Sequence, residues 1–242
     1  MKPPPLRSAA MHRSPLPVFD FPPWRLSGVV VGALLNDPAA LAALGETAHQ
    51  PPYRAPPRAP VLYVKPRNTF APDGARTPLP AGARSLCVGA SISLVIGRAA
   101  CRVPAAEAMS FVAGCTLVVD LYVPHESLYR PSVRERAFDA SCVLGPRVVA
   151  LDALDPDRAT LRIRAGESSA ERVADTSGLL RPAAQLIADV SEFMTLHAGD
   201  VLLLGVRHPA PTIEAGQRWS VECEPIGALH GEALAAREGD AS

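Results

Sequence analysis

Apolar residues along the chain form several short runs with the spacing of strands and few with the spacing of helices. Residues 86–97 and 115–123 are apolar or small almost throughout, which predicts two largely buried strands. Residues 61–64 form a β-branched and aromatic run between proline clusters, which predicts a short strand at a sheet edge. Alternating polar and apolar positions predict half-exposed strands at residues 161–164 and 219–224.

Three segments predict helices. Asp37 followed by Pro38 is typical of an N-cap and a first helical position, so a short helix should begin at Pro38 and end near Gly45 or His49. Pro104 and Gly114 bracket a second helix over residues 104–113. Residues 179–196 predict a third, in which Pro182 falls in the first turn. Its apolar positions at helical spacing are Leu180, Ala184, Ile187 and Phe193. Because strands outnumber helices, the predicted fold class is a β-rich α+β domain.

The proline pattern divides the chain into a domain and two tails. Residues 1–25 carry seven prolines, scattered charge and no apolar run, which predicts a proline-rich disordered tail. Residues 26–233 should form one domain, and residues 234–242 a flexible C-terminal tail. The apolar stretch at residues 26–35 is about half of the roughly 20 residues that a membrane helix needs. We therefore expect no membrane association and a cytoplasmic location.

Charge and cysteine content exclude several classes of protein. Lys+Arg 24 against Asp+Glu 24 gives a net charge of zero, which argues against a nucleic-acid binder. The five cysteines show neither CxxC spacing nor pairing with histidine, so we expect small buried hydrophobic residues in a reducing cytoplasm. No GxSxG, GxGxxG or Walker motif occurs, which leaves acyl-hydrolase and nucleotide-binding interpretations without their minimal parts.

Several motifs in collinear order carry a family resemblance. Residues 89–97 (GASISLVIG) are followed by residues 114–120 (GCTLVVD), and both are preceded by residues 65–69 (KPRNT). Residues 191–200 (SEFMTLHAGD) complete the set. This order resembles the fumarylacetoacetate hydrolase superfamily over about residues 28–231. The resemblance implies a mixed β-roll or sandwich with a few short helices at its ends.

Within that superfamily, three further segments resemble the N-terminal half, or first subunit, of the bifunctional decarboxylase/isomerases of homoprotocatechuate (4-hydroxyphenylacetate) degradation. These segments are residues 51–57, 89–91 and 124–131. The resemblance implies an enzyme of a lyase and isomerase family that acts on small 2-oxo di- or tricarboxylates. The implied substrates are 5-carboxymethyl-2-oxo-hex-3-ene-1,6-dioate and 2-hydroxyhepta-2,4-diene-1,7-dioate.

The resemblance also implies a Mg²⁺ or Mn²⁺ site held by three carboxylates, from which this chain departs. Gly89 and Ser91 replace the two family glutamates, and Asp120 is the one remaining metal ligand. We expect weak or absent metal binding in this chain alone, and restoration of both glutamates to rebuild the three-carboxylate cage. The alternative for Asp120, which we favour, is a strand-end carboxylate hydrogen-bonded to backbone.

Five other residues are candidates for the site. The family's histidine and glutamate base positions fall near Ala40 and Ala43, and Arg136 takes the place of a substrate-contacting lysine, which an arginine cannot replace as a base. The remaining candidates are Lys65, His125, Glu126 and Arg130. Lys65 could face a substrate carboxylate or be a solvated loop cation. His125 with Glu126 could be a general base or an ordinary surface pair, and Arg130 could bind a dicarboxylate or pack at an interface.

Three hypotheses about function follow. The first is a subunit of the decarboxylase/isomerase, whose metal site is supplied by a partner subunit or a paired homologous domain. The second is a non-catalytic scaffold that only assembles with an active homologue. The third is a stand-alone carbon–carbon hydrolase of the same superfamily. We also expect a homodimer or a hetero-oligomer with a homologous subunit, because zero net charge gives little repulsion between copies.

Overall fold

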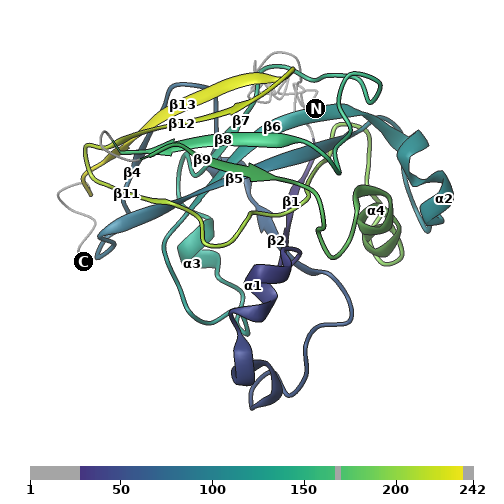
Figure 1. Ribbon diagram of the computed structural model, residues 1–242, viewed down its shortest axis with the longest axis horizontal. Coiled ribbons are helices and arrows are strands. Elements are labelled where there is room, and N and C mark those ends of the chain that lie inside the picture. The colour runs from purple at the N-terminus through teal and green to yellow at the C-terminus, as the bar shows by residue number, and fades with distance from the viewer. Residues whose placement is uncertain (1–27, 167–169, 237–242) are drawn as a thin grey trace, which may run out of the picture.

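The computed structural model describes residues 28–166 and 170–236, whose strands form two sheets (Figure 1). The larger sheet has the order β2-β1-β10-β5-β6-β7-β3, with β11 beside β5, and the smaller has the order β4-β13-β12-β8-β9. The strands are β1 Val30–Leu34, β2 Val61–Lys65, β3 Phe70–Ala71, β4 Ala75–Pro78, β5 Ser85–Ile96, β6 Val112–Tyr122, β7 Cys142–Leu144, β8 Thr160–Ala165, β9 Arg172–Asp175, β10 Val201–Leu203, β11 Thr212–Glu214, β12 Arg218–Cys223 and β13 Gly227–Leu234.

The two long strands β5 and β6 are antiparallel neighbours at the centre of the larger sheet, with Gly89 opposite Asp120. Side chains alternate between the two faces of a strand. Val88, Ala90, Ile92 and Leu94 of β5 belong to the main buried cluster, together with apolar residues of β8, β12 and β13. The core therefore lies between the sheets. The other face of β5 presents the small residues Cys87, Gly89, Ser91 and Ser93, on the same side as Asp120.

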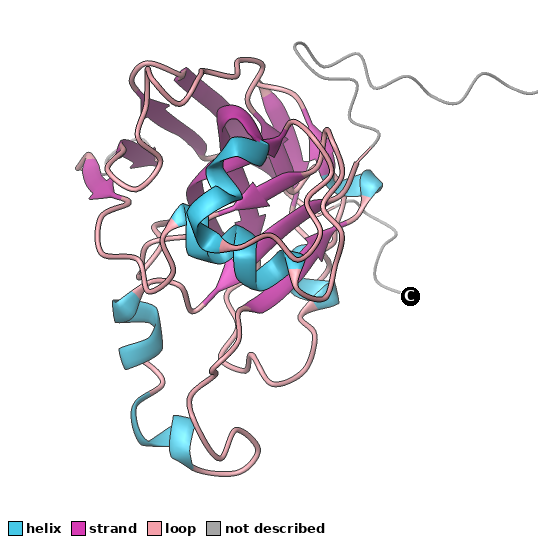
Figure 2. Ribbon diagram, turned by 90° about the vertical axis from the view of Figure 1, so that its right-hand side faces the viewer, coloured by secondary structure: helices cyan, strands magenta, loops and turns pink. Residues whose placement is uncertain are grey.

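The helices are short and lie beyond one end of the sheets or below them in the view of Figure 1. They are α1 Pro38–Ala42, α2 Ala105–Ala108, α3 Val133–Arg136 and α4 Ala183–Ser191, with 3-10 turns at Gly45–His49, Arg67–Thr69 and Met109–Phe111. The predicted N-cap is confirmed, since the Asp37 side chain accepts a hydrogen bond from the Ala39 N–H. Residues from α1 to the start of β2 project from the sheets as a separate lobe (Figures 1 and 2). That lobe forms one wall of the site described below.

All three predicted helices are shorter than predicted, and α1 already ends at Ala42. Residues 104–113 are helical only to Phe111, because Val112 already pairs with Ile96 in the central hairpin. The predicted helix over residues 179–196 begins after Pro182, whose extended ψ of 162° places it at the N-cap and outside the first turn. Its predicted apolar face is also partly wrong. Leu180 and Phe193 are exposed, and the buried positions are Ala183, Leu186, Ile187, Val190 and Ser191.

The remaining predictions about the fold are mostly confirmed. The β-rich α+β class holds, β2 lies at the edge of its sheet, and β8 alternates between buried and exposed residues. Four cysteines are buried as expected, but Cys101 is exposed. Among the described residues no helix is long and apolar enough to cross a membrane. The predicted tail over residues 1–25 lies outside the described residues, and β13 extends to Leu234.

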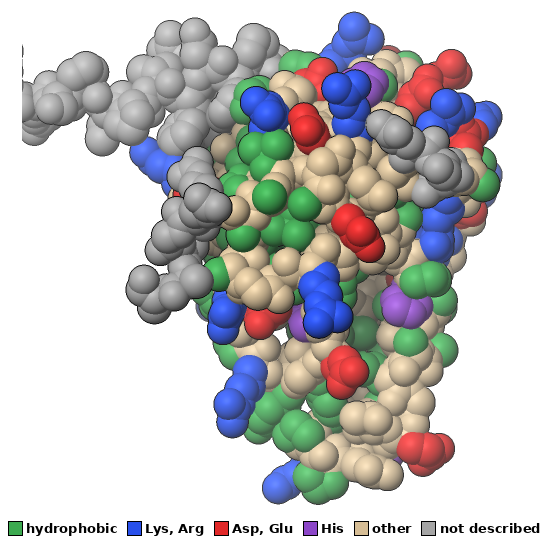
Figure 3. Space-filling view, turned by 90° about the vertical axis from the view of Figure 1, so that its left-hand side faces the viewer, with side chains coloured by type: hydrophobic (Ala, Val, Ile, Leu, Met, Phe, Trp, Pro, Cys, Tyr) green, Lys and Arg blue, Asp and Glu red, His purple; other side chains and the backbone are tan. Residues whose placement is uncertain are grey.

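Charged side chains of both signs are interspersed on the face of the molecule shown in Figure 3. Basic residues there do not gather into a continuous stripe of the kind that follows a nucleic-acid backbone. This distribution agrees with the zero net charge of the sequence.

Candidate active site

A cavity of about 420 Å³ lies where α1, the ends of β2 and β6, α3 and the loop after β10 meet. This volume is within the range of small-molecule sites, roughly 300–1,000 Å³. Ala40 and Ala43, near which the family's two base residues are expected, form part of its wall and offer only methyl groups. The polar groups that line it include Tyr63, Tyr122, His125, Arg136 and His208.

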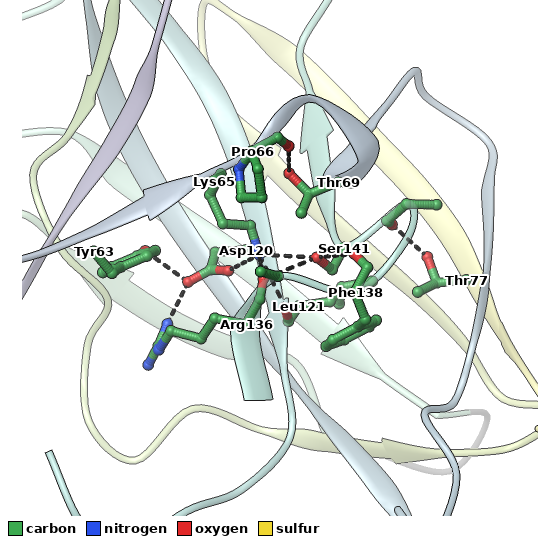
Figure 4. A network of polar contacts seen from close by, with 12 residues as sticks. Tyr63, Lys65, Pro66, Thr69, Thr77, Asp120, Leu121, Arg136, Phe138 and Ser141 are labelled. Carbon is green, nitrogen blue, oxygen red and sulfur yellow. Dashed lines mark hydrogen bonds and ion pairs between the residues drawn. The ribbon is translucent and has the colours of Figure 1, made fainter. Parts of the chain in front are cut away.

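Asp120 lies in a buried network of polar contacts that includes Tyr63 and Arg136 of the cavity wall (Figure 4). One carboxylate oxygen, Oδ1, accepts a hydrogen bond from Lys65 Nζ at 2.7 Å. The other, Oδ2, accepts from the Tyr63 hydroxyl at 2.6 Å and from Arg136 Nη1 at 2.5 Å. The favoured expectation of backbone hydrogen bonds to Asp120 is therefore wrong, because three side chains surround its carboxylate.

Lys65 is a buried cation and not a solvated one. It is the last residue of β2, is 1% exposed, and points its ammonium group into the network. Besides Asp120, Nζ donates to the Arg136 carbonyl at 2.5 Å and to Ser141 Oγ at 3.0 Å. Three acceptors satisfy the three donors of an ammonium group. Lys65 is thus fully engaged inside the protein, which excludes the solvated loop interpretation and leaves no donor for a ligand.

Arg136 closes the network on the side of the cavity. Its guanidinium carbon lies 4.5 Å from the centre of the Tyr63 ring and 4.0 Å from that of Tyr122, so both aromatic rings contact it. Nη1 makes the one hydrogen bond of the guanidinium among the described residues, and Nε is buried with no partner. Burial lowers and the Asp120 carboxylate raises the pKa of Arg136, and the net direction is upward. One edge of a buried, charged guanidinium is therefore left without an acceptor.

Tyr63 acts as a hydrogen-bond donor in this network. Burial, followed by the Asp120 carboxylate, raises the pKa of Tyr63 well above its usual value, so the hydroxyl stays protonated. Its ring occupies the space over Gly32, where an added Cβ would lie 2.2 Å from Tyr63 Cζ. The glycine in β1 thus permits the aromatic ring that orients the carboxylate.

The residues present do not fit a three-carboxylate metal site. Asp120 already has both oxygens bound by cations and a hydroxyl, and no group of three metal-ligating side chains occurs among residues 28–166 and 170–236. A Cβ added to Gly89 would lie 2.6 Å from the Asp120 carbonyl oxygen, so a glutamate there requires the backbone to move. Ser91 Oγ is bonded to the Ile92 carbonyl and accepts from the Gly205 N–H. The close contact at Gly89 therefore stands against the expectation that two glutamates would rebuild the cage.

The other candidates lie around the same cavity or beside it. His125 and Glu126 line the cavity, with Glu126 exposed. Arg130 does not line it, but borders a neighbouring groove of about 520 Å³ that shares Tyr63 and Arg136 with the cavity. Arg207 lines the cavity, but its donors bind Asp37, the Asp175 carbonyl and the Ser177 carbonyl. Of the two arginines in the cavity wall, Arg136 is the one whose guanidinium has N–H donors without an acceptor among the described residues.

Sequence reasoning missed Tyr63, Tyr122 and Ser141, which complete the network. Tyr63 and Tyr122 belong to strand patterns in which an aromatic residue predicts only burial. Ser141 Oγ donates to the carbonyls of Arg136 and Phe138 and accepts a hydrogen bond from Lys65 Nζ. Only the fold brings Ser141 close to Lys65. In the sheet Gly32 lies opposite Tyr63 and Gly89 lies opposite Asp120. These two glycines were the one signal in the sequence that larger side chains need space there.

Comparisons with known proteins agree with this architecture. A profile of the family described as fumarylacetoacetate (FAA) hydrolase C-terminal matches residues 29–232. The 4-hydroxyphenylacetate degradation bifunctional isomerase/decarboxylase of Escherichia coli is 35% identical over 213 residues, which cover 88% of this chain and 48% of that protein. Mitochondrial oxaloacetate tautomerase FAHD1 of Bos taurus is 32% identical over 157 residues, covering 62% of this chain and 70% of that protein. The chain spans about half the length of the isomerase/decarboxylases that it matches.

Solved structures give the same result. The 5-carboxymethyl-2-hydroxymuconate delta-isomerase of Mycobacterium smegmatis has a TM-score of 0.73 and 29% identity, covering 88% of this chain and 81% of that one. A fumarylpyruvate hydrolase from Pseudomonas aeruginosa, solved with Mn²⁺ and pyruvate, has a TM-score of 0.67. It covers 86% of this chain and 88% of that one, but at 18% identity it shows only the shared fold.

Proposed function

The chain belongs to the fumarylacetoacetate hydrolase family, and from that premise we propose that it is a carboxylate-binding subunit of a 4-hydroxyphenylacetate-type isomerase/decarboxylase. The comparisons group it with isomerases, decarboxylases and hydrolases. The proposed substrates are 5-carboxymethyl-2-oxo-hex-3-ene-1,6-dioate and 2-hydroxyhepta-2,4-diene-1,7-dioate. Both are small anions, and we place them in the cavity beside Arg136.

The charge of the buried network supports this proposal. Lys65 and Arg136 contribute two positive charges and Asp120 one negative charge, and all three side chains are almost fully buried. The network therefore has one positive charge more than it has negative charges, and a buried charge without a counterion is costly. An anion that enters the cavity would supply the missing negative charge. Nε and its neighbouring Nη of a guanidinium form a planar edge that matches the two oxygens of a carboxylate. The unpartnered Nε of Arg136 is the single observation that carries the proposal.

A metal-dependent step does not belong to this cavity, because its residues do not fit the ion. We propose that any Mg²⁺ or Mn²⁺ of the complete enzyme is held by a homologous domain with an intact Glu-x-Glu pair. The isomerase/decarboxylases that the chain matches are about twice as long as this chain, which leaves room in them for a second domain of this size. The exposed apolar residues Val64, Tyr129 and Val133 border the groove next to the cavity and offer a surface for such pairing.

Ligand-induced stabilisation tests the binding part of the proposal. The probe is 2-oxoadipate, a six-carbon 2-oxo dicarboxylate, added to the chain in the presence of EDTA. At 100 times Kd a ligand stabilises the folded state by about 2.7 kcal/mol, or roughly 5–10 °C in Tm for a chain of this size. Wild type and Arg134→Met, an exposed arginine of the same helix, should show the shift, and Arg136→Met should lose it. An equal shift in all three proteins would refute the site.

A scaffold without any ligand is the second candidate, favoured by the loss of the metal ligands and by the exposed apolar groove. The two candidates differ in a mixing experiment. Turnover of both substrates is followed in the ultraviolet for this chain, for a homologous subunit with the intact Glu-x-Glu pair, and for the mixture. If wild type and Arg136→Met stimulate the homologous subunit equally, the chain is a scaffold. If Arg136→Met stimulates less than wild type and still co-elutes with the subunit, the chain contributes a binding site.

A further inference from the structure

His125 lines the cavity, and a backbone contact defines the tautomer of its ring. It lies in the loop after β6, and its ring Nδ1 is 2.9 Å from the Val123 carbonyl oxygen. A carbonyl oxygen only accepts hydrogen bonds, so in the neutral ring Nδ1 carries the proton. Nε2 then holds the lone pair. The local backbone thus selects the tautomer whose free nitrogen is a proton acceptor.

Nε2 of His125 has no partner inside the protein. It is buried from solvent and makes no hydrogen bond to any described residue, as is also true of Arg136 Nε. Both residues line the same cavity, and both contact the Tyr122 ring, whose centre lies 6.0 Å from that of the imidazole and 4.0 Å from the guanidinium carbon. Two unsatisfied buried nitrogen atoms, a guanidinium donor and an imidazole acceptor, therefore belong to residues that line one cavity. A ligand with a carboxylate and an acidic C–H bond would satisfy both.

No other group in the cavity wall, among the described residues, is placed as well to accept a proton. Ala40 and Ala43, near which the family's base residues are expected, offer only methyl groups. His208 also lines the cavity, but it is exposed to solvent, as is Glu126. Burial raises the pKa of the Cys87 thiol and a hydrogen bond with Tyr122 lowers it. The net shift is upward, which keeps the thiol protonated.

We propose that His125 Nε2 is the general base of a metal-independent tautomerisation of a 2-oxo dicarboxylate held by Arg136. The inference rests on the proposed function for the carboxylate site and adds the proton-transfer group. Nε2 takes a proton from C3 of the 2-oxo acid, the C–H electron pair becomes the C2–C3 π bond, and the carbonyl π pair moves to the C2 oxygen. The imidazolium returns the proton to that oxygen. The ketone becomes its enol with no other reactant, and the reverse sequence is equally balanced.

Deuterium exchange at C3 measures this step directly. The chain is incubated with 2-oxoadipate in D₂O and EDTA, and proton NMR follows the loss of the C3 signal. A positioned base contributes about 10²–10⁴-fold, so His125→Gln should lower the turnover of exchange at least 100-fold while KM changes less than about threefold. Arg136→Met should raise KM. His197→Gln, an exposed histidine in the turn before β10, is the matched control and should exchange like wild type.

The outcomes separate this inference from the proposed function. Exchange by His125→Gln at the wild-type rate, or its loss in His208→Gln alone, would overturn the role of His125. Ligand-induced stabilisation without any exchange by wild type would also overturn it, and would leave the carboxylate site standing. Absence of stabilisation by 2-oxoadipate in every variant would remove the proposed function and this inference together. A folded His125→Gln protein that still binds 2-oxoadipate but no longer exchanges is the predicted result.

Discussion

Replacement of Asp120 by asparagine separates a structural ion network from a metal ligand. In the network the carboxylate is the one negative charge between two buried cations, and its side chain and that of Lys65 are both fully buried. The substitution keeps the shape and removes the charge. Lys65 then stays inside the protein with neutral acceptors only, and Arg136 loses its ion pair.

The expected loss is large. Breaking a buried ion pair by removal of one partner costs about 3–5 kcal/mol, because the remaining charge is left uncompensated. For a domain of this size that loss lowers the urea midpoint by about 1–2 M. The double variant Asp120→Asn with Lys65→Met should recover part of the loss, since it removes the stranded ammonium, and the coupling energy follows from the double-mutant cycle.

The assay is urea unfolding followed by circular dichroism, in EDTA and again with Mg²⁺. Asp152→Asn, an exposed carboxylate, serves as the matched control and should lie within about 0.5 kcal/mol of wild type. The network interpretation requires the same loss with and without metal. A metal ligand gives the opposite pattern, in which Asp120→Asn is harmless in EDTA and removes a stabilisation by Mg²⁺. That result, or a loss below about 1 kcal/mol in EDTA, would refute the reasoning.

Two further predictions follow from the same structure. Gly89→Glu should destabilise the chain by about 1–3 kcal/mol, because its Cβ meets the Asp120 carbonyl oxygen, and should not create a Mn²⁺ site; micromolar Mn²⁺ binding by calorimetry would contradict this. The stability of the chain should also fall as pH rises above about 9. Burial is the largest cause for both thiols and raises the pKa of Cys115 and Cys142 to about 12 in the folded chain. The thiols of the unfolded chain therefore lose their protons at lower pH than those of the folded chain. The free energy of unfolding falls as pH rises from the unfolded pKa toward the folded pKa. Urea titrations at about pH 8 to 10.5 measure how the free energy of unfolding falls with pH. The fall should be shallower for Cys142→Ala than for wild type and unchanged for the exposed Cys101→Ala. Equal slopes in all three proteins would count against buried thiols as the cause.

The strands β2, β5, β6, β8 and β12 were predictable because their residue patterns are visible in the sequence, whereas short strands such as β3 and β7 leave no such pattern. β5 and β8 differ in burial, and their residue patterns differ accordingly, one continuous and one alternating. Helix ends were less predictable, because tertiary pairing decides them. Val112 favours a strand once Ile96 is opposite it, a fact that the local sequence does not contain.

The site was predictable only in part. The family resemblance named Asp120, Arg136 and His125 as candidates, and the structure places Arg136 and His125 in the wall of one cavity, with Asp120 hydrogen-bonded to Arg136. The state of Lys65 could not be inferred from sequence, since lysine beside proline in a loop-like motif is usually solvated. Its burial depends on Asp120 and Ser141, which are 55 and 76 residues away in the chain. Long-range partners of this kind decide whether a charge is buried or exposed.

Calorimetric titration of 2-oxoadipate into the wild-type chain, once in EDTA and once in Mg²⁺, tests the central claim of a metal-independent carboxylate site most directly. The predicted result is one ligand per chain with affinities that agree within about twofold in the two buffers, and loss of binding in Arg136→Met in both. No heat of binding in EDTA, together with clear binding in Mg²⁺, would contradict the account.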